Sequence, residues 1–284
     1  MNSNSLLIIA VIFFFGACTA ENENPTISYS FFAAGHLYPF GSPQNENFGF
    51  YAPFDSNLNY INNYPNLEFG VFTGDVVADP SASYWDSLQV DLNKVSVPYF
   101  IAPGNHDRGE EFLKRFIYYY QTFYLHEDLF VILTPTNWNI EGDQLDFLKK
   151  TLSDNKDTTN NVFIFLHELI WWSPDNKFCE VHINWPPHYP GSTNYWDEID
   201  PLLRSYPNQI VIFAGDIGCN VLSPCMYYQY DNIILIGSGM GNGTKDNIIF
   251  TDVYSDGSFQ FNLTHLNSQD KNDLGSIEDY AIEE

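Results

Sequence analysis

Residues 97–107 read VPYFIAPGNHD, and this stretch decides the fold. Its first half, Val97–Ala102, is short and rich in β-branched and aromatic residues, which predicts a buried strand. A glycine then ends the strand, and the polar run Asn105–Asp107 follows at once. Polar side chains directly after a buried strand are typical of a ligand site at the carboxyl end of a parallel sheet.

The same pattern recurs along the chain. Five further apolar runs are predicted strands: Ile27–Ala34, Leu67–Thr73, Phe130–Leu133, Val162–Leu166 and Ile210–Ala214. Segments of helical character lie between several of them: Ala82–Asn93, Glu110–Gln121, Gln144–Leu152 and Trp196–Leu203. We expect the last of these helices to be short or kinked because it contains Pro201. Alternating strands and helices predict an α/β sheet with helices on its outer face.

The pattern changes in the last part of the chain, where strands follow one another without helices. These predicted strands are Met226–Tyr230, Ile233–Ile236, Ile248–Tyr254 and Ser258–Leu263. We expect them to form a second sheet packed on the first. The predicted fold class is therefore α/β, with two packed β-sheets flanked by helices.

The amino-acid composition limits which classes of function are possible. The chain has 284 residues, 44% of them apolar, which is enough to bury a large core. Its 11 Lys and Arg against 36 Asp and Glu leave a net charge of −25. Such a charge argues against nucleic acid and against anionic membrane surfaces as general partners. A phosphorylated substrate would therefore have to be bound by a local group of residues that offsets this overall negative charge.

The amino terminus is predicted to be a targeting segment. Leu6–Ala17 is an uncharged apolar run of 12 residues, shorter than the roughly 20 needed to span a bilayer. It is typical of a signal peptide over residues 1–17, so we expect an exported protein, periplasmic or at the cell surface. Phe15–Cys18 resembles a lipobox, which would place a lipid anchor on Cys18 as the only membrane contact. Ordinary cleavage after Ala20 is the alternative.

Two further features concern the body and the end of the chain. Cys219 and Cys225 are close enough in sequence to form a disulfide, and three unbridged thiols, with Cys179, are an equal alternative. The main domain is expected over residues 27–265. Residues 266–284 are expected to form an acidic, solvated tail.

Five predicted strands end in residues of the types that commonly bind metals or transfer protons in proteins. They supply His36, Asp75, Asn105 with its neighbouring histidine, His167 and Asp216. Each one alone is explained by a turn, a cap or a half-buried histidine. Together, delivered to one rim, they form a plausible shell of oxygen and nitrogen ligands for a divalent cation.

These residues give the sequence a resemblance to the calcineurin-like metallophosphoesterases. Gly74-Asp75, Gly104-Asn105-His106-Asp107 and His167 match the family motifs in order and spacing. The resemblance implies a four-layer α-β-β-α sandwich and a divalent metal of the Mn, Fe or Zn type. The sequence departs from the family at Ala34-Gly35-His36, where a carboxylate is missing, and at Gly215-Asp216-Ile217-Gly218, where both histidines of a Gly-His-x-His motif are missing.

The resemblance also implies ligand roles. Asp75 would be shared by two metals, and Asn105 and His167 would bind the second one, with Asp216 as an oxygen substitute for an imidazole. The first site keeps only His36 and the shared aspartate. One tightly bound ion and a weakened second site are therefore expected.

The same resemblance assigns the proton transfer. His106 would protonate the leaving alkoxide, and Asp79 could orient its imidazole. The expected reaction is hydrolysis of a small-molecule or glycan-linked phosphate ester, with a phosphomonoester or a phosphodiester as substrate. A catalytically silent relative that binds a surface polysaccharide or an envelope partner is the alternative, and a purely structural envelope lipoprotein is a third.

An insertion over residues 168–194 is rich in proline and tryptophan. Its aromatic side chains could stack on a substrate or cover the edge of the core, and we favour the core. His182 and His188 are interpreted as ordinary loop surface.

Overall fold

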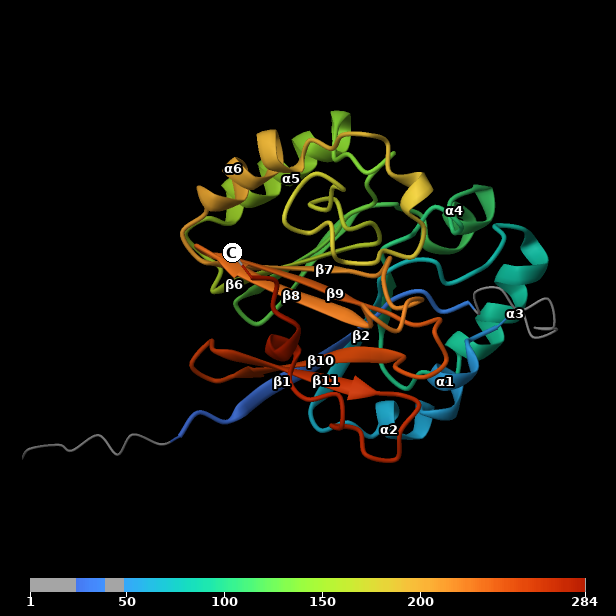
Figure 1. Cartoon of the computed structure of the whole chain (residues 1–284). Coiled ribbons are helices and arrows are strands. Elements are labelled where there is room, and N and C mark those ends of the chain that lie inside the picture. The colour runs from blue at the N-terminus through green and yellow to red at the C-terminus, as the bar shows by residue number, and fades with distance from the viewer. Residues whose placement is uncertain (1–23, 39–48, 284) are drawn as a thin grey trace, which may run out of the picture.

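A computed structural model describes residues 24–38 and 49–283 of the chain. Two β-sheets pack face to face, and helices cover their outer faces (Figure 1). In spatial order, the first sheet contains β11 (Phe259–His265), β10 (Asn247–Tyr254), β1 (Ile27–Ala34), β2 (Leu67–Phe72) and β3 (Tyr99–Ile101). The second contains β4 (Gln121–Leu125), β5 (Asp128–Ile132), β6 (Asn161–Leu166), β7 (Gln209–Ala214), β9 (Ile233–Ser238) and β8 (Cys225–Tyr230).

The helices divide between the two outer faces. In Figure 1, α5 (Gly142–Asn155) and α6 (Asp200–Arg204) cover the second sheet, and α1 (Ala52–Ser56) and α2 (Leu58–Asn62) lie against the first. The helices α3 (Ala82–Leu92) and α4 (Glu110–Phe116) follow β2 and β3 in the chain. A π-helical turn, Tyr195–Ile199, leads directly into α6, so the segment around Pro201 is short and irregular, as expected. The predicted α/β sandwich of two sheets flanked by helices is confirmed.

Aromatic side chains fill the space between the sheets. Phe31 of β1 stacks on Phe69 of β2, with ring centroids 5.2 Å apart. Its edge contacts reach Phe130, Phe163 and Phe213 on the facing sheet at 5.1–6.0 Å. All five rings are buried. Each such ring removes a large apolar area from water, so this cluster holds the two sheets together.

The assignment of strands to sheets differs from the prediction. The four C-terminal strands do not form a sheet of their own. β8 and β9 extend the β5-β6-β7 sheet, while β10 and β11 pair with β1. Hydrophobic pattern defines where a strand begins and ends, but not which strand it pairs with, because pairing depends on contacts far away in the chain.

Smaller differences concern local elements. The predicted helix Glu110–Gln121 ends at Phe116, because Ile117 adopts a left-handed backbone (φ 68°) and the chain then enters β4. The predicted solvated tail is wrong for its last part. Ile277 is fully buried, and Ile282 donates a backbone hydrogen bond to Tyr227 of β8 (2.9 Å). Apolar residues between the acidic ones dock this segment onto the sheet.

Three cysteines in the described residues, Cys179, Cys219 and Cys225, are free thiols, so the unbridged alternative holds for them. Cys18 and the rest of the predicted signal peptide lie outside the described residues. Within the described ranges, no helix is both long and apolar enough to cross a membrane.

Candidate active site

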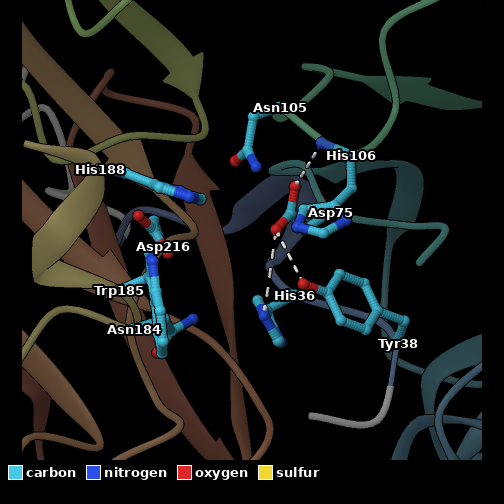
Figure 2. Close-up of a pocket in the computed structure, with 9 residues that line it drawn as sticks. All are labelled: His36, Tyr38, Asp75, Asn105, His106, Asn184, Trp185, His188 and Asp216. Carbon is cyan, nitrogen blue, oxygen red and sulfur yellow. Dashed lines mark hydrogen bonds and ion pairs between the residues drawn. The ribbon is translucent and has the colours of Figure 1, made fainter. Parts of the chain in front are cut away.

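The carboxyl ends of strands from both sheets meet at one edge of the sandwich. His36 follows β1, Asp75 follows β2, Asn105 and His106 follow β3, and Asp216 follows β7. All five line one cavity of about 440 Å³ (Figure 2). We call it the main cavity; its other lining residues are Tyr38, Asn184, Trp185 and His188. The structure therefore brings four of the five predicted strand ends to one cavity; the fifth, which supplies His167, does not line it.

The backbone at the cavity floor is held in unusual conformations. His36 and Asp75 have φ angles of 57° and 53°, in the left-handed region that non-glycine residues rarely adopt. Their strands are locked together, since His36 N donates to Gly74 O (3.0 Å) and Leu37 N donates to Asp75 O (2.9 Å). Strained backbone that the surrounding structure fixes in this way is typical of functional sites.

Gly104 explains how two loops approach so closely. A Cβ atom at this position would lie 2.2 Å from Asp75 Oδ1 and 2.8 Å from Asp75 N. Only glycine leaves room for the carboxylate, so the glycine of the Gly-Asn-His-Asp stretch is required by packing as well as by the turn.

Asp107 ties the same two loops together from below. It is fully buried, and its carboxylate accepts hydrogen bonds from the backbone amides of Val76 (2.9 Å), Val77 (3.1 Å) and Gly104 (2.8 Å). Burial and the nearby charge of Asp75 raise the pKa of Asp107 to about 6. Its role is to position the loops that carry Asp75 and His106.

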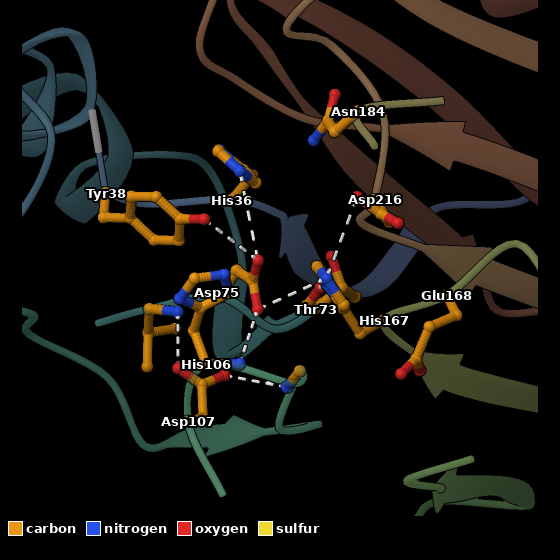
Figure 3. Close-up of polar contacts among 12 residues, drawn as sticks. His36, Tyr38, Thr73, Asp75, His106, Asp107, His167, Glu168, Asn184 and Asp216 are labelled. Carbon is orange, nitrogen blue, oxygen red and sulfur yellow. Dashed lines mark hydrogen bonds and ion pairs between the residues drawn. The ribbon is translucent and has the colours of Figure 1, made fainter. Parts of the chain in front are cut away.

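His167 is fully buried, and its ring lies beside Thr73, Asp75 and Asp216 (Figure 3). Its Nδ1 lies 3.0 Å from Thr73 O, an acceptor, so Nδ1 carries a proton. Its Nε2 lies 3.3 Å from Asp75 Oδ1 and 3.9 Å from Asp216 Oδ1, and it has no hydrogen-bond partner among the described residues. The predicted neighbours Asp75, His167 and Asp216 are therefore close together.

The charges of this group are tightly linked. Burial lowers the pKa of His167, but the carboxylates of Asp75 and Asp216 outweigh burial and raise it well above its usual value. Burial raises the pKa of Asp75, and the positive charge of His167 more than reverses this effect, so the net shift is downward. Burial raises the pKa of Asp216 to about 7. A positive charge placed between the carboxylates of Asp75 and Asp216 would therefore be stabilised.

A divalent cation is one way to supply that charge. Donor atoms that share one ion at about 2.0–2.2 Å lie roughly 3–3.5 Å apart, and the Asp75–His167 separation of 3.3 Å agrees with this geometry. Asn105 brings an amide to the same cavity, and Figure 2 shows its side chain directed inward. Yet among the described residues no three His, Cys, Asp or Glu side chains are arranged to hold a metal ion. Asp75 and His167 thus fit a cation as a pair, and other donors must complete its shell.

The predicted first metal site has weaker support. His36 Nε2 lies 4.0 Å from Asp75 Oδ2, and burial lowers the pKa of His36 to about 4, so its ring is neutral. Its neighbours are the Tyr38 ring (4.5 Å between centroids) and Cys219 Sγ (3.7 Å from Nδ1). Burial raises the pKa of the Cys219 thiol, which keeps it protonated.

His106 is oriented by a backbone carbonyl. Its Nδ1 lies 2.8 Å from Ala78 O, which leaves Nε2 available to carry a transferable proton. Asp79, predicted as the orienting acid, instead accepts a hydrogen bond from Ser81 N (2.9 Å) at the exposed start of α3. A carboxylate that accepts from the amide two residues further on is directed to its own backbone, so the carbonyl of Ala78 takes the orienting role expected for Asp79.

Sequence reasoning missed the cavity wall that the insertion provides. Trp171, Trp172 and Tyr195 are buried in the core, as interpreted. Trp185 is 47% exposed and lines the main cavity together with His188, which is exposed on the loop surface as interpreted but also faces this cavity. Nothing in the spacing of these residues indicated this location, because the insertion is irregular and has no periodic pattern.

Together, the fold and this site define an α/β sandwich protein with metal-ligand side chains at the ends of its strands. A model of the calcineurin-like phosphoesterase family matches residues 36–219, well over half of the chain. The chain belongs to that family, and the resemblance inferred from the motifs is confirmed. The family generally acts on phosphate esters with the help of divalent metal ions.

One solved structure supports the fold. A purple acid phosphatase from seeds of yellow lupin (Lupinus luteus) is 11% identical, with a TM-score of 0.56 over 84% of this chain and 52% of its own. The sulfate thiohydrolase SoxB of Thermus thermophilus is 9% identical, with a TM-score of 0.49 over 91% of this chain and 60% of its own. The chain thus spans about half of the length of the lupin phosphatase. No curated protein sequence matches this chain.

Proposed function

We propose that this protein is an exported, metal-dependent phosphoesterase that hydrolyses a phosphomonoester or phosphodiester of a small molecule or glycan. One observation carries the proposal. His167 Nε2 is buried and makes no hydrogen bond among the described residues, yet it lies at ion-pair distance from the carboxylates of Asp75 (3.3 Å) and Asp216 (3.9 Å), which line the main cavity. Family membership supplies the reaction class.

The residues divide the chemistry between them. Asp75 and His167, the pair that fits an ion, would hold a divalent cation of the Mn, Fe or Zn type, with Asn105 and Asp216 proposed to complete its shell; the ion when bound would supply Lewis-acid chemistry to the phosphate ester. His106 keeps its Nδ1 proton on the carbonyl of Ala78 (2.8 Å) and holds the transferable proton at Nε2.

The proton balance follows from this arrangement. Water attacks phosphorus, the ester P–O bond breaks, and the leaving oxygen takes the Nε2 proton of His106 to depart as an alcohol. The proton released by the attacking water restores the Nε2 proton of His106, and the second product is inorganic phosphate from a monoester or a phosphomonoester from a diester. His36, neutral because burial lowers its pKa to about 4, lines the cavity without adding charge at neutral pH.

The metal content of the purified protein tests the proposal. We expect about one equivalent of a transition metal in the wild type, and its loss in Asp75→Ala and in His167→Ala. Asp128→Asn is the matched control, because Asp128 is a buried carboxylate that lines a different cavity. A wild type that binds no metal would overturn the proposal.

A second measurement tests the proton transfer. His106→Ala should abolish metal-stimulated hydrolysis of an aryl phosphodiester while the metal stays bound, because none of the buried carboxylates is changed. Activity that survives this substitution would contradict the role of His106.

One observation favours a second candidate, a silent relative that binds a polysaccharide or an envelope partner. Among the residues that the structure describes, no three His, Cys, Asp or Glu side chains are placed to hold an ion. The same metal measurement decides between the two functions.

Export is the part of the proposal that rests on Leu6–Ala17 alone. Cell fractionation would place the mature chain outside the cytoplasm. Cys18→Ser should release it from the membrane if Cys18 carries a lipid. If the protein is soluble with Cys18 intact, ordinary cleavage after Ala20 is the correct alternative.

A further inference from the structure

A second cavity of about 320 Å³ adjoins the main cavity. Its lining residues are Asn105, Arg108, Asn137, Trp138, Glu168 and His188, and we call it the side cavity. It shares Asn105 and His188 with the main cavity. A substrate whose phosphate lies at the floor of the main cavity therefore has room for its organic group beyond these two residues.

Glu168 gives the side cavity an unused acceptor. Its side chain is only 4% exposed, and Oε1 accepts a hydrogen bond from Arg108 Nη2 (2.8 Å). Oε2 is buried and has no hydrogen-bond partner within the described part of the chain. A buried polar atom left unpaired costs about 1–3 kcal/mol. An unpaired oxygen in the wall of a cavity therefore indicates that a bound ligand supplies the missing hydrogen-bond donor.

Arg108 makes the wall close to neutral. Its guanidinium pairs with Glu168 and also donates to the backbone carbonyl of Pro135 (2.6 Å). The positive charge is thus balanced by Glu168, although the buried Nε of Arg108 also has no hydrogen-bond partner among the described residues, and the free carboxylate oxygen of Glu168 would repel a second phosphate. A cationic ligand gains little either, because the charge of Glu168 is balanced by Arg108.

A tight turn completes the wall. Thr136 and Asn139 exchange two backbone hydrogen bonds (2.8 and 3.0 Å), and between them Asn137 and Trp138 have φ angles of 51° and 64°. Tryptophan is rarely found in this region. The turn brings an amide and an indole to the side cavity.

We propose that the side cavity is a subsite for a hydroxyl-bearing group, the sugar or polyol part of the phosphate ester. A hydroxyl can donate to Glu168 Oε2 and also accept from an amide such as that of Asn137, which neither a phosphate nor an ammonium group can do. The indole of Trp138 offers an apolar wall beside these polar groups. The inference rests on the proposed function for the reaction, but binding can be measured without it.

The subsite can be tested with two ligands that both carry a phosphate, of which only one carries a sugar with hydroxyl groups. Calorimetric titration of the metal-loaded protein should show that glucose 6-phosphate binds at least tenfold more tightly than methyl phosphate. Glu168→Gln should reduce the affinity for glucose 6-phosphate about 10- to 100-fold, the usual value of one hydrogen bond to a charged group. The affinity for methyl phosphate should change less than threefold.

A second variant guards against misfolding. Asn137→Gly removes the amide but keeps the left-handed backbone, which glycine adopts readily, and it should weaken glucose 6-phosphate binding several-fold. Asn66→Gly is the matched control, because Asn66 has a similar φ (54°), is exposed and lines neither cavity. It should bind both probes as the wild type does.

The outcomes separate the two proposals. Equal affinity for the two probes in the wild type, or unchanged affinity in both Glu168→Gln and Asn137→Gly, would overturn the subsite. Selective binding that depends on Glu168, without hydrolysis of either ester, would support the subsite and overturn the proposed reaction.

Discussion

Replacing Asp107 with alanine should strongly destabilise the loops that carry Asp75 and His106. The carboxylate accepts three backbone amide hydrogen bonds of 2.8–3.1 Å from the loops after β2 and β3. All three amides would lose their acceptor in Asp107→Ala. Because the side chain is fully buried, little water could replace it without a rearrangement of the loops.

The magnitude follows from these three bonds. Each buried amide left unpaired costs about 1–3 kcal/mol. Part of this cost is offset, because burying the carboxylate is itself unfavourable: burial raises the pKa of Asp107 to about 6. We expect a net loss of about 3–5 kcal/mol in the free energy of unfolding. Asp107→Asn retains one oxygen but turns an amide group toward a donor, so it should lose about 1–3 kcal/mol.

Urea unfolding, followed by tryptophan fluorescence, measures these losses from the transition midpoint at an unchanged slope. Asp79→Ala is the matched control, since Asp79 lies in the loop after β2 that Asp107 holds, but is exposed and accepts one backbone bond, from Ser81. It should leave the midpoint near that of the wild type. If Asp107→Ala loses less than about 1 kcal/mol, the loops do not depend on this carboxylate, and our account of how the site is positioned is refuted.

Three further predictions concern the site and the C-terminal segment. Gly104→Ala should displace the carboxylate of Asp75, because the new Cβ would lie 2.2 Å from its Oδ1; the bound metal should be lost, and full metal content would contradict this. Ile277→Ala, at a fully buried position, should cost about 2–4 kcal/mol in urea unfolding, whereas a solvated tail would cost nothing. Asp79→Ala should leave the rate of ester hydrolysis unchanged, because a backbone carbonyl orients the catalytic imidazole; a tenfold loss of rate would return that role to Asp79.

The predictable part of this protein is local. Strands such as Ile27–Ala34 were predicted to the residue, because β-branched and aromatic runs reflect burial directly. The polar residues that follow these strands could be predicted to lie at one edge of the sandwich, because the carboxyl ends of parallel strands meet at the same edge of a sheet. The pairing of β10 with β1 was not predictable, because it joins Ile27 to Tyr254 across nearly the whole chain.

The cavity walls were the least predictable part of the site. His188 and Trp185 belong to an irregular insertion, and no periodicity shows which way such a loop folds. Glu168 was passed over for a different reason. It follows His167 directly, and only its burial and its unpartnered oxygen distinguish it from an ordinary acid at a strand end.

The position of β1 has a consequence for how the chain matures. This strand lies inside its sheet, between β2 and β10, as the blue strand beside the orange ones in Figure 1 shows. A growing polypeptide that has not yet reached β10 therefore carries β1 with one open side, and an unpaired strand side invites association with other chains. Contacts between such distant segments also slow folding. A nascent chain released before the final hairpin should thus depend on chaperones to avoid aggregation.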